Sequence, residues 1–124
     1  IFTFAAKPDA IEHKADPSLW AAATHKEPLD KLKKYQIKPL KQGQISGLNG
    51  VILGVAKKRG IKGACLLCEI PFYTVQIENP KSSLKILGVL GDYLKLNLNL
   101  SPLEERAKFI ETEIDKFISY LKGE

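Results

Sequence analysis

Few residues in this chain could do chemistry, and one glycine turn is the first group to consider. Gly47, Asn49 and Gly50 open an apolar helical pattern, where backbone amides could hold an anion at the helix N-terminus. Glu69 ends the next apolar segment, so a parallel sheet would bring its carboxylate to the same edge. The sequence therefore predicts either a small-ligand site at this turn or a structural role, with Glu69 as a hydrogen-bond anchor for the turn.

The other reactive side chains do not form a recognisable site. Cys65 and Cys68 lie in a strand-like run, where residues three apart point to opposite faces, so neither a disulfide nor shared metal ligation follows. We expect two buried thiols, which suit a reducing cytoplasm. His13 and His25 are the two histidines, too few for a metal site with the carboxylates nearby.

No catalytic motif accompanies these residues. The chain has no nucleophile elbow, Walker-type phosphate loop or dinucleotide fingerprint. We expect no catalytic residue, no cofactor and no metal. The enzyme question stays open, and the absence of a motif favours a protein without catalytic activity.

Size and composition exclude several classes of protein. The chain has 124 residues, 27% of them charged and 44% apolar, which is ordinary for one globular domain. No apolar run approaches the roughly 18 residues that a membrane span needs. The net charge of +5 suggests a polyanion partner, but the lysines at 31–41 have only Tyr35 among them as a stacking aromatic. We therefore expect neither a membrane nor a nucleic acid as partner.

The elements around the glycine turn form a strand–helix–strand unit. Residues 43–46 read as a strand end, and Ser46 is a suitable helix N-cap. The following helix should bury Leu48, Ile52 and Val55 and should stop at Gly60, a residue that tolerates left-handed backbone. Residues 64–68 then read as a strand covered on both faces. This order predicts an α/β fold with a mainly parallel sheet.

The remaining elements follow from turn and capping signals. Residues 1–6, 19–23 and 37–40 read as extended pieces, with a helix as the alternative for 19–23. Thr24 to Glu27 has capping-box form and should open a helix to about Tyr35. Asn79 and Pro80 open another helix, to about Leu94, after an apolar loop at 70–78. Residues 96–100 are either a short strand or a connector.

The last helix carries the strongest apolar pattern. It begins at a second capping box, Ser101 to Glu104, and repeats apolar residues at alternating spacings of four and three from Leu103 to Leu121. This seam either docks on the chain's own sheet or forms a subunit interface. The residues that we expect to bind a partner are aromatic or apolar and lie in the 70–78 loop and the last helix: Phe72, Tyr73, Phe109, Phe117, Tyr120 and Leu121.

Several of these motifs, in this order, resemble the archaeal branch of the proteasome assembly chaperone family. The similarity covers about residues 37–120: the Gly-Leu-Asn-Gly turn, the Lys-Lys-Arg-Gly-Ile helix end, the strand closing on Glu69, Asn79-Pro80, and the Leu-Ser-Pro-Leu-Glu-Glu start of the last helix. The resemblance implies a three-layer α/β/α architecture like that of the nucleoside phosphorylases, without their catalytic residues. Family members are roughly twice as long. This chain, which lacks methionine, is therefore expected to be their C-terminal half as one α/β domain.

The resemblance also implies a function. It points to a cytoplasmic, homo-oligomeric and non-enzymatic chaperone or adaptor, with proteasome α-subunits or another adaptor as partner. Docking members end in a hydrophobic residue, Tyr and any residue, whereas here Tyr120 is followed by four residues to Glu124. Some members are described as related to ATP-grasp proteins, but no phosphate-binding residues are present. The alternatives are a small-molecule or nucleotide-binding domain using the Gly47–Gly50 turn, or a purely structural oligomer.

Overall fold

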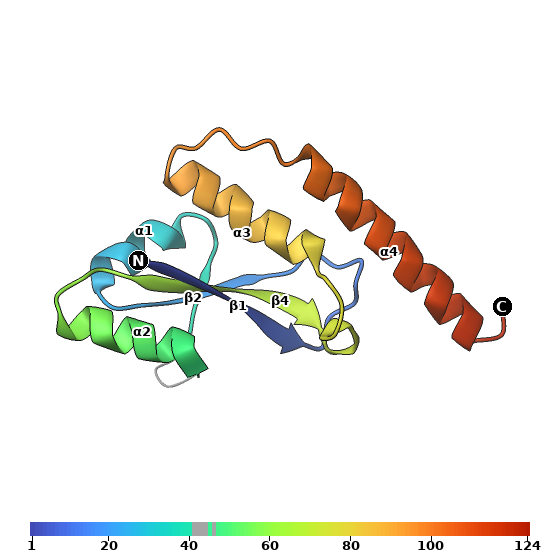
Figure 1. Ribbon diagram of the computed structural model, residues 1–124, viewed down its shortest axis with the longest axis horizontal. Helices are drawn as coiled ribbons and strands as arrows, with labels where there is room; N and C mark the ends of the chain where they lie inside the picture. The colour runs from blue at the N-terminus through green and yellow to red at the C-terminus, as the bar shows by residue number, and fades with distance from the viewer. Residues whose placement is uncertain (41–44, 46) are drawn as a thin grey trace. The chain divides into compact units, whose positions relative to one another are not determined.

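A computed structural model describes residues 1–40, 45 and 47–124 of the chain (Figure 1). The predicted strand end around Gly43 and the predicted cap at Ser46 lie outside the described residues. The chain divides into two compact units. Unit 1 comprises residues 1–7 and 18–69, and unit 2 comprises residues 8–17 and 70–124.

A four-stranded sheet has the strand order β1-β4-β2-β3. Its strands are β1 (Phe2–Asp9), β2 (Leu19–Ala23), β3 (Lys38–Pro39) and β4 (Ala64–Pro71). The α/β class is confirmed, and the sheet is mixed: β2 is parallel to β3 and antiparallel to β4. Nine residues join β1 to β2, fewer than a parallel crossover of a dozen or more residues needs, so β2 returns in the opposite direction.

Strand β4 is the buried strand that the apolar run predicts. All eight of its residues are buried. Cys65 and Cys68 are both free thiols within it, as predicted. In the antiparallel register with β2, Leu19 lies opposite Cys68, and Ala23 lies opposite Ala64. A strand of this kind has no solvated face, which explains why its sequence does not alternate.

Helix α2 (Gly47–Lys58) forms where predicted, but its predicted inner face is wrong. Leu48 and Val55 are 71% and 49% exposed, whereas Leu53 and Ala56 are buried. The helix is turned so that Leu53 and Ala56 face inward, and a Cβ on Gly50 would lie 2.8 Å from the carbonyl oxygen of Ile45. The predicted stop is confirmed, because Gly60 has a φ of +71° after the last turn.

Helix α1 (Lys26–Lys33) begins without the capping box that its sequence suggests. The N-cap residue is His25, whose side chain makes no cap hydrogen bond. The Thr24 hydroxyl instead accepts a hydrogen bond from the Gly63 amide at 2.9 Å, which ties the end of β2 to the start of β4. The need to pair a buried backbone amide therefore takes precedence over the local cap.

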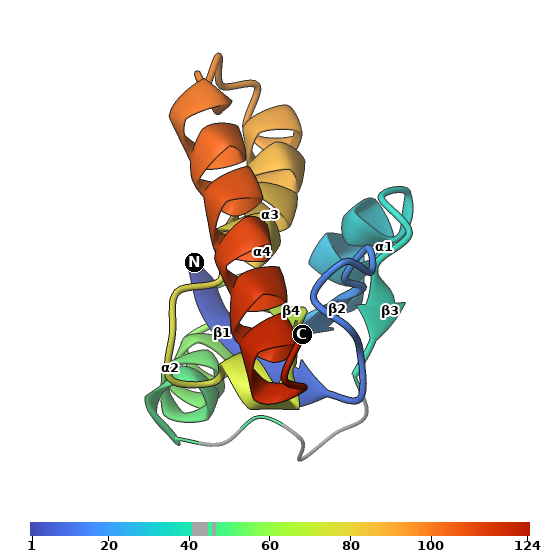
Figure 2. The ribbon, with the colours of Figure 1, turned by 90° about the vertical axis from the view of Figure 1, so that its right-hand side faces the viewer.

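Unit 2 contains a 3-10 turn η1 (Phe72–Thr74) and two helices, α3 (Pro80–Tyr93) and α4 (Ser101–Leu121). The two helices pack against each other and lie side by side in both ribbon views (Figures 1 and 2). Residues 96–100, between them, form an irregular connector rather than a strand. The N-cap of α4 is Leu100 without a side-chain bond, so the capping box predicted at Ser101 does not form, although the helix starts where expected.

Candidate functional site

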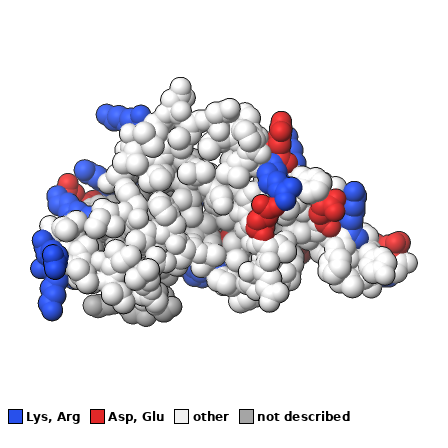
Figure 3. All heavy atoms as spheres, viewed as in Figure 1, with Lys and Arg blue, Asp and Glu red and all other residues white. Residues whose placement is uncertain are grey.

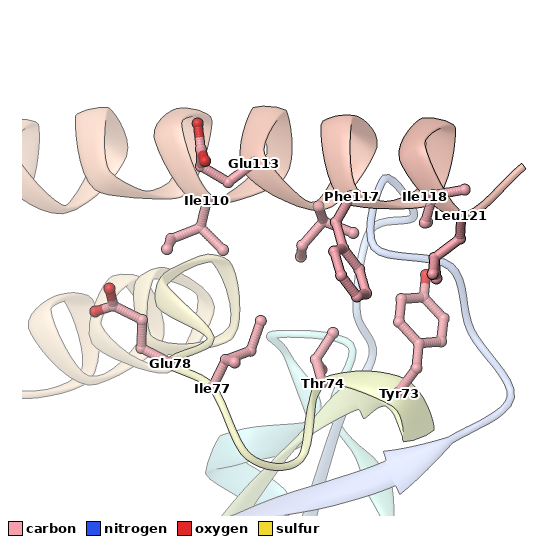
Figure 4. Close-up of a pocket in the computed structure, with 10 residues that line it drawn as sticks. Tyr73, Thr74, Ile77, Glu78, Ile110, Glu113, Phe117, Ile118 and Leu121 are labelled. Carbon is pink, nitrogen blue, oxygen red and sulfur yellow. The ribbon is translucent and has the colours of Figure 1, made fainter. Parts of the chain in front are cut away.

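An apolar groove runs along the C-terminal half of α4 in unit 2. It has a volume of about 830 Å³ and is closed on the other side by η1 and the residues that follow it. In Figure 4, Phe117 and Leu121 point from α4 toward Tyr73, which points up from η1. The groove is lined by Tyr73, Thr74, Ile77, Glu78, Ile110, Glu113, Ile114, Phe117, Ile118 and Leu121.

The heptad pattern of α4 explains why these side chains share one side. Ile110, Ile114, Phe117 and Leu121 recur at spacings of four, three and four, which places them along one stripe of the helix. No residue of α4 is fully buried. Phe117 is 61% exposed and Leu121 is 66% exposed. A helix that leaves aromatic and leucine side chains this exposed presents an apolar surface to solvent.

The opposite wall is fixed by Thr74 and Asn79. The Thr74 side chain is 1% exposed, and its hydroxyl donates to the Pro71 carbonyl at 2.9 Å, with the Asn79 Oδ1 at 3.0 Å. The Asn79 Nδ2 donates back to the carbonyls of Thr74 and Ile77 at 3.0 and 3.2 Å. Asn79 is the N-cap of α3, as predicted, but its side chain holds this loop and makes no cap bond.

A histidine network fixes Tyr73 and α4 to the loop between β1 and β2, in which His13 lies. His13 Nδ1 lies 2.8 Å from the Tyr73 hydroxyl, and His13 Nε2 lies 2.7 Å from Asp115 Oδ1 on α4. The His13 amide also donates to the Tyr73 hydroxyl at 2.8 Å. One tautomer satisfies the whole network: Nε2–H donates to the Asp115 carboxylate, and the Tyr73 hydroxyl donates to Nδ1.

The carboxylate at the end of this network is stabilised in its charged form. The hydrogen bond from His13 lowers the pKa of Asp115 below its ordinary value, and Lys14, whose Nζ lies 3.2 Å from Asp115 Oδ2, acts in the same direction. The sequence places His13 only in a polar loop. Its partners are 60 and 102 residues away along the chain, so no local signal could have identified the network.

The predicted partner residues fall into two groups. Tyr73, Phe117 and Leu121 line the groove. Phe72, Phe109 and Tyr120 lie outside it and are 60%, 50% and 78% exposed. Arg106 stands over the Phe109 ring, with its Cζ 5.0 Å from the ring centre.

The predicted glycine-turn residues have structural contacts in unit 1. Gly47 has a φ of +68°, and the Asn49 amide donates to the Phe4 carbonyl at 3.2 Å. Gly50 lies against the Ile45 backbone. These contacts hold the start of α2 against neighbouring backbone.

Glu69 has partners on the side of β2. Its carboxylate is buried and accepts from the Ser18 amide at 3.0 Å and the Trp20 indole at 3.1 Å. These two bonds anchor β2 to β4. The sequence predicts that Glu69 anchors the glycine turn, whereas the partners in these two contacts belong to β2 and to the residue before it.

The described part of the chain, residues 1–40, 45 and 47–124, carries neither a metal-binding cluster nor a membrane-spanning helix. Within them, no group of three or more His, Cys, Asp or Glu side chains is placed to hold a metal ion. Likewise, none of the helices in this part of the chain is long and apolar enough to cross a membrane.

The mixed sheet of unit 1 and the helices of the two units define an α/β protein. The sequence profile of the PAC2 family matches residues 1–118, and the chain belongs to this family. An uncharacterized protein of Methanocaldococcus jannaschii is 33% identical over 99 residues, which are 79% of this chain and 37% of that protein.

Solved structures share the fold. PbaB of Pyrococcus furiosus, described as an archaeal proteasome activator, is 26% identical, with a TM-score of 0.77 over 94% of this chain and 49% of PbaB. PbaA of the same organism, an archaeal homologue of proteasome-assembly chaperone, is 23% identical, with a TM-score of 0.76 over 99% of this chain and 50% of PbaA. A proteasome-assembly chaperone homologue of Mycobacterium tuberculosis is 20% identical, with a TM-score of 0.78 over 95% of this chain and 49% of the homologue. The chain thus spans half the length or less of these relatives.

Proposed function

We propose that this protein is a non-enzymatic adaptor or chaperone that binds other proteins through unit 2. The observation that carries the proposal is the exposed apolar surface made by the groove and by Phe72, Phe109 and Tyr120 beside it. Large apolar residues that stay exposed together mark protein-binding surfaces more often than catalytic sites. The hydrogen-bond network at His13 positions the walls of this surface.

The proposed partners are proteasome α-subunits or another adaptor, and the proposed location is the cytoplasm. The family and the described roles of PbaA and PbaB support this choice. The match of residues 37–120 to the motifs quoted above also supports the proposal that the chain corresponds to the C-terminal half of longer relatives. The proposed route of contact is through the exposed apolar side chains of unit 2.

The test is a pull-down of proteasome α-subunits from the source organism with the chain and with three variants. One variant lacks residues 119–124, one carries Phe72→Ala and Tyr120→Ala, and the third carries Leu96→Ala as a matched exposed apolar control. Leu96 is 50% exposed and lies in the connector, outside the groove.

We expect the chain and the Leu96→Ala control to retain α-subunits, and the Phe72/Tyr120 variant to retain several-fold less, since aromatic side chains dominate interface energies. If only the variant that lacks residues 119–124 fails to retain α-subunits, the contact lies in those residues. Failure of the unaltered chain to retain α-subunits would refute a direct proteasome contact.

A further inference from the structure

Helix α2 in unit 1 carries an exposed apolar stripe that ends in positive charge. Leu48, Val51 and Val55 are 71%, 62% and 49% exposed, and their spacings of three and four place them along one side of the helix. Lys58 is exposed three residues after Val55, and Arg59 follows it. We call these five residues the α2 stripe. In Figure 3, blue side chains gather at the edge where α2 ends.

The apolar part of the stripe does not belong to the core of unit 1. The inward side of α2 is formed by Leu53 and Ala56, which are 8% and 2% exposed. Single exposed apolar side chains are common on protein surfaces, whereas three neighbours on one side of a helix form a patch of the kind that binds a partner. A partner that covers this patch removes its apolar area from water, which favours binding.

The positive end of the stripe lacks a carboxylate partner. Unit 1 contains eleven Lys and Arg against three Asp and Glu, a net charge of +8. Its three carboxylates are engaged elsewhere: Glu27 and Asp30 pair with other lysines, and Glu69 accepts hydrogen bonds at β2. Within the part of the chain that the structure describes, no ion pair includes Lys58 or Arg59. These two cations are therefore available to carboxylates of another molecule.

We propose that the α2 stripe binds an acidic, amphipathic segment of another protein. Apolar side chains of that segment, at helical spacing, cover Leu48, Val51 and Val55, and its carboxylates lie against Lys58 and Arg59. Charge complementarity determines this class of partner, because α2 contains no acidic residue and a basic segment would be repelled. Burial of the apolar side chains provides affinity, and the charged end of the stripe fixes the direction of the bound segment.

Two other classes of anionic partner fit the stripe less well. A nucleic acid presents phosphates along its whole length, and α2 has no aromatic side chain on which a base could stack. A helix that lies on a membrane surface carries Lys and Arg along its polar face. The cations of α2, in contrast, are confined to its last turn, at Lys57 and Lys58. A segment with separate apolar and acidic parts matches this arrangement.

The inference goes beyond the proposed function and does not depend on it. The proposed contact with α-subunits uses the exposed apolar side chains of unit 2, whereas the α2 stripe belongs to unit 1. The chain would then carry a separate protein-binding surface in each unit.

The test begins with a display library of random peptides of about 16 residues, which as helices are long enough to cover the stripe. Peptides are selected on the immobilised chain and, in parallel, on Val51→Glu. We expect the unaltered chain to enrich peptides that combine Asp or Glu at one end with large apolar residues at spacings of three and four, and Val51→Glu to lose this pattern. Enrichment of basic peptides, or of no common pattern, would overturn the proposal.

Fluorescence anisotropy then measures the affinity of one enriched peptide for the chain and its variants. Val51→Glu should weaken binding by about tenfold or more, because it would bury a carboxylate against apolar side chains. Leu96→Glu in unit 2 is the matched control, since it adds the same charge at an exposed apolar site and should leave binding unchanged. Circular dichroism shows that each variant is folded.

A charge exchange tests the basic end of the stripe. The double variant Lys58→Glu, Arg59→Glu should also weaken binding by about tenfold or more. A peptide in which lysines replace the acidic residues should bind this double variant more tightly than the unaltered chain. Equal binding of the two peptides to both proteins would overturn the role of Lys58 and Arg59.

Three further measurements identify a different occupant of the stripe. Sedimentation with vesicles of equal parts phosphatidylcholine and phosphatidylserine, anisotropy with labelled single-stranded DNA, and sedimentation velocity of the chain alone are each repeated with Val51→Glu. If this change abolishes vesicle binding, DNA binding or self-association, the stripe belongs to a membrane, a nucleic acid or a second copy, and the proposal is wrong. Retention of α-subunits is scored separately, so its failure contradicts only the proposed function.

Discussion

Glu69 shows how a single buried carboxylate can hold a sheet together. Its oxygens accept hydrogen bonds from a backbone amide just before β2 and from the Trp20 indole within β2, while the residue itself belongs to β4. A buried carboxylate is costly unless such donors surround it. The residue is therefore a structural part of unit 1, and its removal should affect stability more than binding.

We expect Glu69→Ala to lower the free energy of unfolding by about 2 kcal/mol, because the Ser18 and Trp20 donors lose a charged acceptor. Glu69→Gln keeps one carbonyl acceptor and should cost less. Urea unfolding followed by Trp20 fluorescence measures both. Equal stability of the unaltered chain and the alanine variant would show that the two hydrogen bonds contribute nothing.

The Cys65 thiol, also in β4, should be protected from reagents in the folded protein. Burial raises its pKa above the ordinary value of 9.0, so the reactive thiolate is disfavoured. Reaction with a thiol-specific disulfide reagent at pH 8 should be slow until denaturant is added, when both cysteines react. Cys68→Ser isolates the Cys65 signal, and rapid labelling of that variant without denaturant would contradict its burial.

The same raised pKa sets a pH dependence. The folded state binds the Cys65 proton more tightly than the unfolded state, so its stabilising effect is complete below pH 9 and is lost as the pH rises through the folded pKa. Melting temperatures should therefore fall more steeply above pH 9 in the unaltered chain than in a Cys65→Ala variant. If the melting temperatures of the two proteins fall equally with pH above 9, the Cys65 thiol does not cause this pH dependence.

Among the elements, α2 offers a matched set of glycines. A Cβ at Gly54 would meet nothing within 4 Å, whereas one at Gly50 would lie 2.8 Å from the Ile45 carbonyl oxygen. Gly54→Ala should stabilise the protein by about 0.5–1 kcal/mol through helix propensity, and Gly50→Ala should destabilise it by at least a comparable amount. Chemical denaturation of both variants is the measurement. If Gly50→Ala stabilises the protein, the Ile45 backbone does not approach Gly50 closely.

Helix α4 depends on its contact with the loop between β1 and β2, and this dependence should appear at acid pH. The pKa of Asp115 is lower in the folded state, so its contribution is present above the unfolded value near 3.8 and is lost as the pH falls through the folded pKa. Asp115→Asn should lower the melting temperature at pH 7, and its difference from the unaltered chain should shrink below about pH 4.

Glu105→Gln is the control for this experiment, because it removes a carboxylate from the same helix without touching His13. A difference that stays constant from pH 7 to pH 3 would show that the ionised form of Asp115 is not what stabilises α4. A His13→Ala variant should lower the melting temperature at pH 7 in the same way as Asp115→Asn.

At the scale of the whole molecule, local patterns predicted most elements and few of the contacts. The sequence predicted the buried strand β4 and the apolar seam of α4, because burial on both faces gives a continuous apolar run and a helix gives apolar residues at spacings of three and four. The sequence did not predict which side of α2 is buried, because this depends on the approach of the Ile45 backbone to Gly50. The network of His13, Tyr73 and Asp115 was hidden for a similar reason: it joins three distant segments, each unremarkable alone.

The uneven charge of the molecule leads to a last prediction, that polyanions bind only weakly and without sequence preference. Unit 1 carries a net charge of +8, but its one tryptophan, Trp20, is not free to stack on a base. The ammonium groups of Lys7 and Lys38 lie 4.6 and 5.2 Å from its ring centre, and its indole N–H donates to Glu69. Binding to single-stranded DNA should therefore be purely electrostatic.

Fluorescence anisotropy with a labelled single-stranded DNA should show binding at low salt that is lost by about 150 mM, where a few phosphate contacts no longer suffice. Polyglutamate should compete as well as unlabelled DNA, since only charge is recognised. Binding that persists at this salt concentration and prefers one base composition would show that unit 1 contains a stacking site. In that case, the net charge of +8 would belong to a nucleic-acid surface.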